Sequence, residues 1–439
     1  MIDELGLECA SIDKWSTNDN PSNMIKSIRE SLYLKGYFCD IHTLQLAIND
    51  AFKDVEGMSH VLQKSKAIAA FTHKRPLAQQ KLKSACQQRN KKFRKLKNPG
   101  DTRWNGKHSN MESVLYLKEV LQSLFIEDED TWGPHTFRGS DWKLLQGAVT
   151  ILKPFLVCTK VLEAEKVPTI NRSIEQMYNL ENYLNDFISR TGNCQYGITF
   201  ARALKKRLFE RFPSLGMDMF EKSVANYLDP RYMGLHLAEY GTLESTKIRM
   251  ESKWGSDSEE TQSQPVALNL DLSPTSRLLQ RSRLSRLDTG ASKIRKEMAI
   301  YESYSFASKA SDVLGWWRLH EEHLPILAQI ARRILAIPAS SAKSERVFST
   351  GGLIVSTKRG SLGPKKVEEL IVIKQNMSKV KLFLATSKYK IGVGSKNAFE
   401  SIIVHKTAGE VLEEPVEDMY DLENEDDSEP EDEIMDILD

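Results

Sequence analysis

The clearest pattern of hydrophobic and polar positions lies in the last third of the chain. Between Leu327 and Ile337, apolar residues recur at steps of three and four, which predicts an amphipathic helix. Pro338 follows, and because proline lacks an amide hydrogen and restricts the residue before it, we expect the helix to stop there. A similar spacing between Val367 and Ile373 predicts another amphipathic helix farther along the chain.

A further helix is predicted between these two. The hydroxyl of Ser340 or Ser341 can accept a hydrogen bond from a free amide and so cap its start, with Glu345 in or near the first turns. Gly351 and Gly352 are expected to end it. Three amphipathic helices with this much apolar surface need a partner, which is either the body of the chain or a second copy.

The start of the chain alternates between strand-like and helix-like patterns. A stretch near residues 9–17 and the run 37–41 predict strands, and residues 24–34 and 42–52 have the spacing of helices. The Asx-rich stretch 18–24 predicts a turn between them. This alternation favours a small α/β unit with parallel strands.

The middle of the chain has helical spacing almost throughout. Residues 110–250 carry apolar stripes, with a break expected near Pro154. Residues 255–276 are rich in Ser, Glu, Gln and Pro without periodicity, which predicts a disordered loop. We therefore predict a mostly α fold with a small α/β part.

Composition narrows the class of protein. The 439 residues are enough for two or three domains. No run of eighteen apolar residues predicts a membrane span, and the N-terminus lacks the pattern of a secretory signal. The five cysteines are widely spaced and odd in number, which favours a reduced intracellular chain and offers no zinc-finger spacing. We expect no membrane partner and no protein-bound metal from these residues.

The net charge of +1 hides a strong asymmetry along the chain. Residues 410–439 contain sixteen acidic residues and no basic ones. Without those sixteen negative charges the rest of the chain carries +17, which suits a polyanionic partner such as DNA. A basic body with an acidic tail is a recurrent nuclear pattern, although either half can serve solubility alone. The apolar residues at the end of the tail also allow it to dock on a partner protein.

Much of the positive charge is concentrated in residues 57–100. This stretch holds twelve Lys and Arg residues and no acid, with a cluster at Lys91, Lys92, Arg94 and Lys95. Two interpretations stay open. The cations either form the solvated face of a helix or contact phosphates, which position a protein on a duplex without reading its sequence.

The exact residues of the C-terminal region are more informative about the protein family than their hydrophobic periodicity. Residues 337–352 read Ile-Pro-Ala-Ser-Ser-Ala-Lys-Ser-Glu-Arg-Val-Phe-Ser-Thr-Gly-Gly, preceded by a Trp316-Trp317 pair. This run closely resembles the C-terminal dimerisation signature of the hAT superfamily of transposases and the host proteins derived from them, including BED-type zinc finger proteins. The resemblance covers about residues 7–380 and implies a homodimer. We expect the dimer face to include Leu327, Ile334, Val347, Phe348, Leu370 and Ile373.

The start of the chain is similar to the same family. Thr17-Asn-Asp-Asn-Pro-Ser-Asn-Met24 resembles the motif around the second catalytic aspartate of its RNase H-like domain, which implies that role for Asp19. Cys39-Asp-Ile-His42 resembles the motif that follows. The third catalytic acid of the family lies in Ser-Glu-Arg, which corresponds to Glu345.

Two further motifs match the family. Thr102-Arg-Trp-Asn105 resembles its Arg-Trp motif near the active site, which implies DNA contacts for Arg103 and a stacking role for Trp104. Residues 228–231, Leu-Asp-Pro-Arg, resemble the motif where a helix of the helical insertion ends in a sharp turn. The implied architecture is an incomplete RNase H-like fold with a helical insertion domain and a helical C-terminal dimerisation region.

The expected division of the chain follows from these motifs. We assign residues 1–56 to a partial RNase H-like unit, 57–109 to a basic helix with the Arg-Trp segment, 110–300 to the helical insertion, 301–380 to the dimerisation region, and 381–439 to a linker and acidic tail.

The first catalytic aspartate of the family has no counterpart before Asp19, where only eighteen residues stand. We therefore expect Asp19 and Glu345 to be relics of an incomplete acid set, with Mg²⁺ bound only if a longer N-terminus completes it. Three readings remain: an inactive hAT-derived nuclear protein that dimerises and associates with DNA or chromatin, a fragment of an active transposase, or a scaffold for protein interactions.

Overall fold

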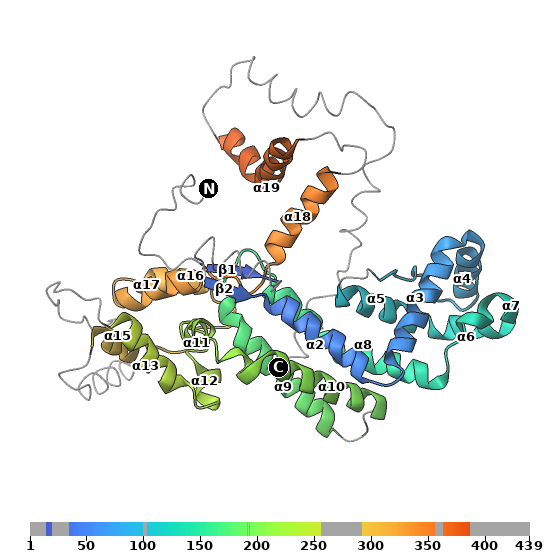
Figure 1. Cartoon of the computed structure of the whole chain (residues 1–439), viewed down its shortest axis with the longest axis horizontal. Helices are drawn as coiled ribbons and strands as arrows, with labels where there is room; N and C mark the ends of the chain where they lie inside the picture. The colour runs from blue at the N-terminus through green and yellow to red at the C-terminus, as the bar shows by residue number, and fades with distance from the viewer. Residues whose placement is uncertain are drawn as a thin grey trace, which may run out of the picture. The chain divides into compact units, whose positions relative to one another are not determined.

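The computed structural model of the protein describes residues 15–19, 35–99, 103–190, 192, 194–255, 292–355 and 363–386. Those residues are mostly helical, as the periodicity predicts, and Figure 1 shows the helices as coiled ribbons. The chain divides into two compact units, Met1–Ala342 and Lys343–Asp439, which are described separately. The predicted helix at 24–34, the predicted loop at 255–276 beyond its first residue, and the acidic tail lie outside the described residues.

Two short strands form a parallel pair near the start of unit 1. β1 (Trp15–Asn18) lies beside β2 (Lys35–Phe38), with Asn18 opposite Phe38. α2 (Asp40–Asp54) begins directly after β2, and Sγ of Cys39 accepts a hydrogen bond from the amide of His42 at the first turn of the helix. The strand–helix order and the parallel pairing agree with the predicted α/β unit.

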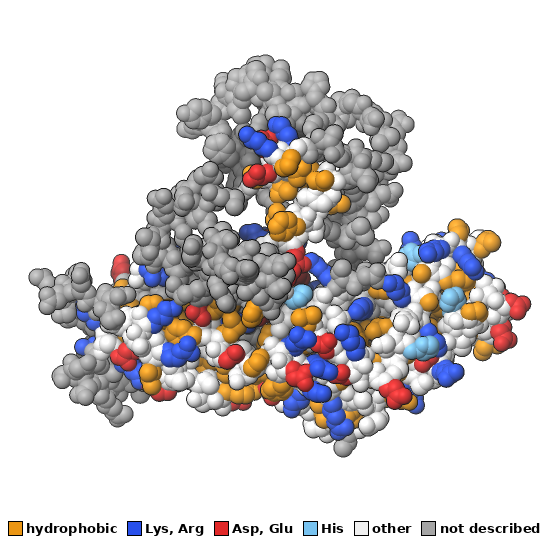
Figure 2. All heavy atoms as spheres, viewed as in Figure 1, with side chains coloured by type: hydrophobic (Ala, Val, Ile, Leu, Met, Phe, Trp, Pro, Cys, Tyr) orange, Lys and Arg blue, Asp and Glu red, His pale blue; other side chains and the backbone are white. Residues whose placement is uncertain are grey.

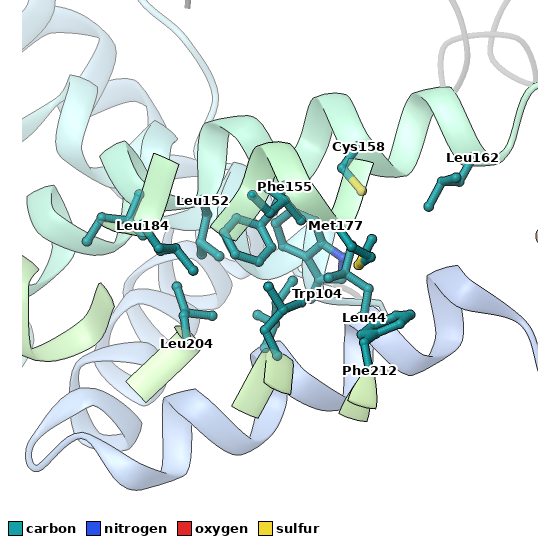
Figure 3. Packing of buried hydrophobic residues seen from close by; sticks show 14 of the residues in the cluster. Leu44, Trp104, Leu152, Phe155, Cys158, Leu162, Met177, Leu184, Leu204 and Phe212 are labelled. Carbon is teal, nitrogen blue, oxygen red and sulfur yellow. The ribbon is translucent and has the colours of Figure 1, made fainter. Parts of the chain in front are cut away.

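Long helices build the core of unit 1. α8 (Gly139–Leu162), α9 (Ile170–Ser189) and α10 (Gln195–Arg211) pack on one another, and α10 also packs along α2. Figure 3 shows Leu44, Phe155, Met177 and Leu204 from these four helices gathered in one buried cluster. α8 is long and apolar enough to cross a membrane, but most of it is buried inside the unit, as expected of a core helix.

Pro154 lies inside α8 and does not break it, so that prediction is wrong. A proline in a helix leaves the carbonyl four residues earlier without its amide donor. Here that carbonyl belongs to Thr150, and the Tyr183 hydroxyl of α9 donates to it at 3.3 Å. A side chain from the neighbouring helix therefore compensates for the lost hydrogen bond.

The basic stretch is not one helix. It forms α3 (Met58–Lys74) and α4 (Pro76–Gln88), and residues 91–99 then run without helix or strand. Pro76 occupies the first position of α4, where its missing amide costs nothing. The helices that follow are α5 (Trp104–Tyr116), α6 (Lys118–Glu127) and α7 (Glu129–Trp132), with a 3₁₀ turn η2 at Gly133–His135.

The rest of unit 1 consists of shorter helices. They are η3 (Pro213–Gly216), α11 (Phe220–Tyr227), α12 (Leu235–Glu239), α13 (Leu243–Trp254), α15 (Lys293–Tyr301), α16 (Val313–His320) and α17 (Pro325–Ile334). The Leu-Asp-Pro-Arg motif makes a sharp turn after α11, where the Asp229 carboxylate accepts a hydrogen bond from the Arg231 amide at 3.1 Å. α17 stops before Pro338, as predicted, and packs on α11, α15 and α16.

The described part of unit 2 contains most of α18 (Ala342–Ile354) and α19 (Pro364–Thr386). α18 continues through Gly351 and Gly352, so the prediction that they end it is wrong. A Cβ atom on Gly351 would lie 3.1 Å from Cδ1 of Ile371. This glycine therefore serves the close approach of α19 to α18 rather than the end of the helix.

Candidate functional site

The candidate site lies where the two strands end. Because β1 and β2 are parallel, their carboxyl ends meet at the same edge of the sheet, which places Asp19, Cys39 and Asp40 there. The segment from Pro338 to Ser341 runs along this edge. The Thr17 hydroxyl donates to the Pro338 carbonyl at 2.8 Å, and the Asp40 amide donates to the Ala339 carbonyl at 2.9 Å.

Ser341 connects both strand ends. Its hydroxyl donates to Oδ1 of Asp19, and its amide donates to Sγ of Cys39 at 3.3 Å. Burial raises the pKa of the Cys39 thiol above its usual value. A protonated sulfur is a poor ligand for a hard cation, so Asp19 is the group at this edge that suits Mg²⁺.

The neighbouring carboxylate, Asp40, is fully engaged inside the protein. Its Oδ1 lies 2.5 Å from Nζ of Lys222 on α11, and its Oδ2 accepts a hydrogen bond of 2.6 Å from the Ser173 hydroxyl on α9. All three side chains are buried. Asp40 therefore anchors the start of α2 to two other helices and is not free to bind a metal ion. Sequence reasoning missed Lys222 and Ser173, because nothing in their local sequence marks them.

Glu345, the other acid that the resemblance implies, lies in the first turn of α18 in unit 2, four residues after Ser341. Its side chain is half-buried. The structure thus defines the surroundings of Asp19 in unit 1 and the helical position of Glu345 in unit 2.

Trp104 is buried, whereas the resemblance implied a ring available for stacking on a base. It is the first residue of α5, and its ring is 1 % exposed in the core of unit 1. Figure 3 shows the ring among Leu152, Phe155 and Met177. In this structure it is not presented for stacking on a base, so the predicted stacking role is corrected to a packing role. Arg103, which precedes it, is exposed.

The predicted dimer residues divide into two groups. Leu327 and Ile334 on α17 are buried in unit 1, where they pack against its own helices and are closed to a second copy. On α18, Phe348 is 74 % exposed and Val347 is half-buried. Leu370 and Ile373 on α19 are also half-buried. The two α17 residues are thus already covered within unit 1, and a dimer face at Val347, Phe348, Leu370 and Ile373 stays a prediction.

Unit 2 exposes further apolar residues that the sequence did not identify. Leu353, Val355 and Val372 are exposed, and Figure 2 shows hydrophobic side chains at the surface where Figure 1 places α18 and α19. A groove of about 430 Å³ lies between these helices, lined by Val355, Pro364, Val367, Glu368, Ile371 and Val372. Leu353 and Val355 were missed because the helix was expected to end at the two glycines.

Comparison with known protein families finds a match for the C-terminal region. Residues 296–377 match the model described as the hAT family C-terminal dimerisation region. This range includes α16 to α18 and part of α19.

Comparison with known proteins extends the similarity over most of the chain. A Zea mays protein named as an AC transposase is 24% identical over 400 residues, which cover 84% of this chain and 48% of that protein. The Arabidopsis thaliana zinc finger BED domain-containing protein DAYSLEEPER is 25% identical over 62% of this chain and 40% of its own length. Human zinc finger BED domain-containing protein 4 is 21% identical over 77% of this chain and 29% of its own length. The chain spans about half the length, or less, of these relatives.

Proposed function

We propose that this chain, an hAT transposase-like protein with the C-terminal dimerisation region of that family, self-associates through α18 and α19 and associates with DNA without catalysing strand transfer. One observation carries the proposal. The region that matches the dimerisation model contains the most exposed large apolar side chain of α18, that of Phe348.

Self-association follows from the chemistry of this surface. Phe348, Leu353 and Val372 are each more than half exposed and lie on the two helices of unit 2. Burying apolar surface contributes about 25 cal/mol per Å² removed from water, so a second copy that covers these side chains would be stabilised. Contiguous exposed apolar surface on a soluble protein marks an interaction site.

We propose that strand transfer is absent because the chain has too few carboxylates at the motif positions. Two divalent cations in such a site are held by several carboxylate oxygens. The motif positions within these 439 residues supply Asp19 and Glu345, and the nearby Asp40 is occupied by Lys222 and Ser173. The residues present do not fit a two-metal centre, and we derive no catalytic step from them.

DNA association is proposed from charge. Outside residues 410–439 the chain carries a formal +17, which favours binding to a polyanion. Association with DNA or chromatin would also place the protein in the nucleus. The acidic tail, by its composition, would then either compete with DNA for the cations or bind a partner protein.

A second reading is that this sequence is part of an active transposase. The observation in its favour is that the chain covers only 48% of its AC transposase relative. In that case, further N-terminal residues would complete the acid set and allow Mg²⁺ to bind. A scaffold that binds only proteins is the third reading.

One experiment separates these readings. Two copies of the chain with different tags are co-expressed, one is captured, and the eluate is tested for the other copy and for retention of duplex DNA on a filter. The proposal expects both. Co-capture without DNA retention would favour the scaffold, and cleavage of the duplex with Mg²⁺ would favour the active transposase.

A further inference from the structure

The irregular segment after α4 is fixed to the face of α5. We call residues 91–97 the basic strap. The Tyr116 hydroxyl donates to the Lys92 carbonyl at 3.0 Å. At the other end, the Lys97 amide donates to Oγ of Ser113 at 3.0 Å, and the side-chain amide of Asn110 donates to the Lys97 carbonyl at 2.8 Å. These three α5 residues are spaced by three and so share one face of the helix.

Apolar contacts fix the strap between these hydrogen bonds. Leu96 is 1 % exposed, and Phe93 packs against the core of unit 1. A ring nitrogen of His73 at the end of α3 donates to the Leu96 carbonyl. The main chain of the strap is therefore hydrogen-bonded at Lys92, Leu96 and Lys97, and the side chains of Phe93 and Leu96 pack inward, although the strap has no regular secondary structure.

One class of cations in the basic stretch pairs with acids. On the helices, Lys64 lies 2.8 Å from Asp141, Lys81 lies 2.5 Å from Asp128, and Arg89 lies 3.0 Å from Glu127. Acids from the neighbouring segments thus neutralise these cations. Lys91, at the start of the strap, also belongs to this class, since it lies 3.7 Å from Glu119.

Lys92, Arg94 and Lys95 lie outside this class, and the three are close together on the strap. All three are exposed, and within the described ranges none of them forms an ion pair. The Arg94 guanidinium lies 4.4 Å from the centre of the Tyr116 ring, which orients it without neutralising it. Phe93 and Leu96 point into the protein. The side chains of Lys92, Arg94 and Lys95 therefore extend into solvent, and their main chain is held in place.

We infer that Lys92, Arg94 and Lys95 form a contact surface for the phosphate backbone of duplex DNA. This inference rests on the proposed DNA association and names its site. The four residues from Lys92 to Lys95 reach at most about 14 Å, and each strand of a duplex carries one phosphate charge per about 3.4 Å, so three adjacent contacts fit along it. A fixed main chain loses less conformational freedom on binding than a mobile one.

The same geometry implies that this surface does not read sequence. Three of its main-chain groups are already bonded to α5, and its two apolar side chains are turned inward. Lysine and arginine contacts to phosphate position a protein on DNA and carry no base information. Binding at the strap therefore depends on salt and not on the sequence of the duplex.

The test measures affinity of the full chain for a short mixed-sequence duplex between about 50 and 200 mM salt. The combined change Lys92→Gln, Arg94→Gln and Lys95→Gln should make the slope of log K against log salt shallower by roughly two to three, since each contact contributes about 0.9. The conservative pair Lys92→Arg and Lys95→Arg should keep the slope of the unaltered chain.

The matched control removes three positive charges elsewhere, with Lys53→Gln, Lys81→Gln and Lys206→Gln. These side chains are exposed and ion-paired, so their loss should change the slope by less than one contact. Equal effects of the two triple variants, at unchanged melting behaviour, would overturn the inference while leaving DNA association standing. If the unaltered chain shows no salt-dependent affinity, DNA association itself is wrong.

Discussion

Nζ of Lys222 lies 2.5 Å from Oδ1 of Asp40, and both side chains are almost fully buried. The two residues are 182 positions apart in the chain, so the pair joins the first helix after the strands to α11. The Ser173 hydroxyl completes the surroundings of the carboxylate from α9. The buried pair therefore connects the start of α2, at the same edge of the sheet as Asp19, to α11.

Breaking this pair from one side should be costly. Lys222→Met leaves the Asp40 carboxylate buried without a counter-charge, which typically lowers the free energy of unfolding by about 3–5 kcal/mol. Chemical denaturation measures the change. Lys53→Met serves as control, because Lys53 pairs with Asp50 at the surface and its loss should cost less than about 1 kcal/mol. A Lys222→Met variant as stable as that control would contradict the structural role of the pair.

We expect Glu297 to make the stability of the fold depend on pH. It is a buried residue of α15 whose carboxylate accepts hydrogen bonds from the amides of Ile326 and Leu327 at the start of α17. Burial raises the pKa of this carboxyl from 4.5 to about 7. The folded state therefore keeps a proton that the unfolded state has lost between these two values, and the free energy of unfolding falls as pH rises through this window.

The Glu297→Gln variant should remove this dependence, because its carbonyl still accepts a hydrogen bond but does not titrate. At about 1.4 kcal/mol per pKa unit, the difference between the two proteins should change by up to about 3 kcal/mol from pH 4.5 to 7. Urea titrations at several pH values measure it. Parallel stability curves for the two proteins would show that Glu297 does not carry this linkage.

The chain as given should not cleave DNA. With Asp40 occupied, Asp19 and Glu345 are too few to hold two cations, so incubation of a duplex with Mg²⁺ or Mn²⁺ should leave it intact. Gel electrophoresis of the substrate gives the result. Metal-dependent cleavage that Asp19→Ala abolishes, while Asp218→Ala does not, would show that the chain completes a catalytic site on its own.

Several elements could be predicted from sequence because their signals are local. The apolar spacing before Pro338 predicted α17, and the alternation of strand and helix patterns predicted β2 and α2. The break expected at Pro154 failed because the compensating Tyr183 hydroxyl comes from another helix.

The candidate site shows the same limit. Asp19 could be placed just after a strand from the strand and turn patterns around it. The partner of Asp40 and the burial of Trp104 have no local signal, since both depend on residues far along the chain. The two glycines of α18 were misread for the same reason, because their close neighbour, Ile371, lies on α19. Long-range packing decides these positions, and a single sequence does not record it.

Self-association through α18 and α19 is the central claim, and the mass of the chain in solution over a dilution series tests it most directly. The chain of 50.0 kDa should sediment at twice that mass and dissociate on dilution. Phe348→Asp with Leu353→Asp should raise the dissociation constant more than about tenfold, which is about 1.4 kcal/mol. Leu77→Asp, at an exposed position of α4, should leave it unchanged. A mass of 50.0 kDa at every concentration, or a double variant that dimerises like the unaltered chain, would contradict the account.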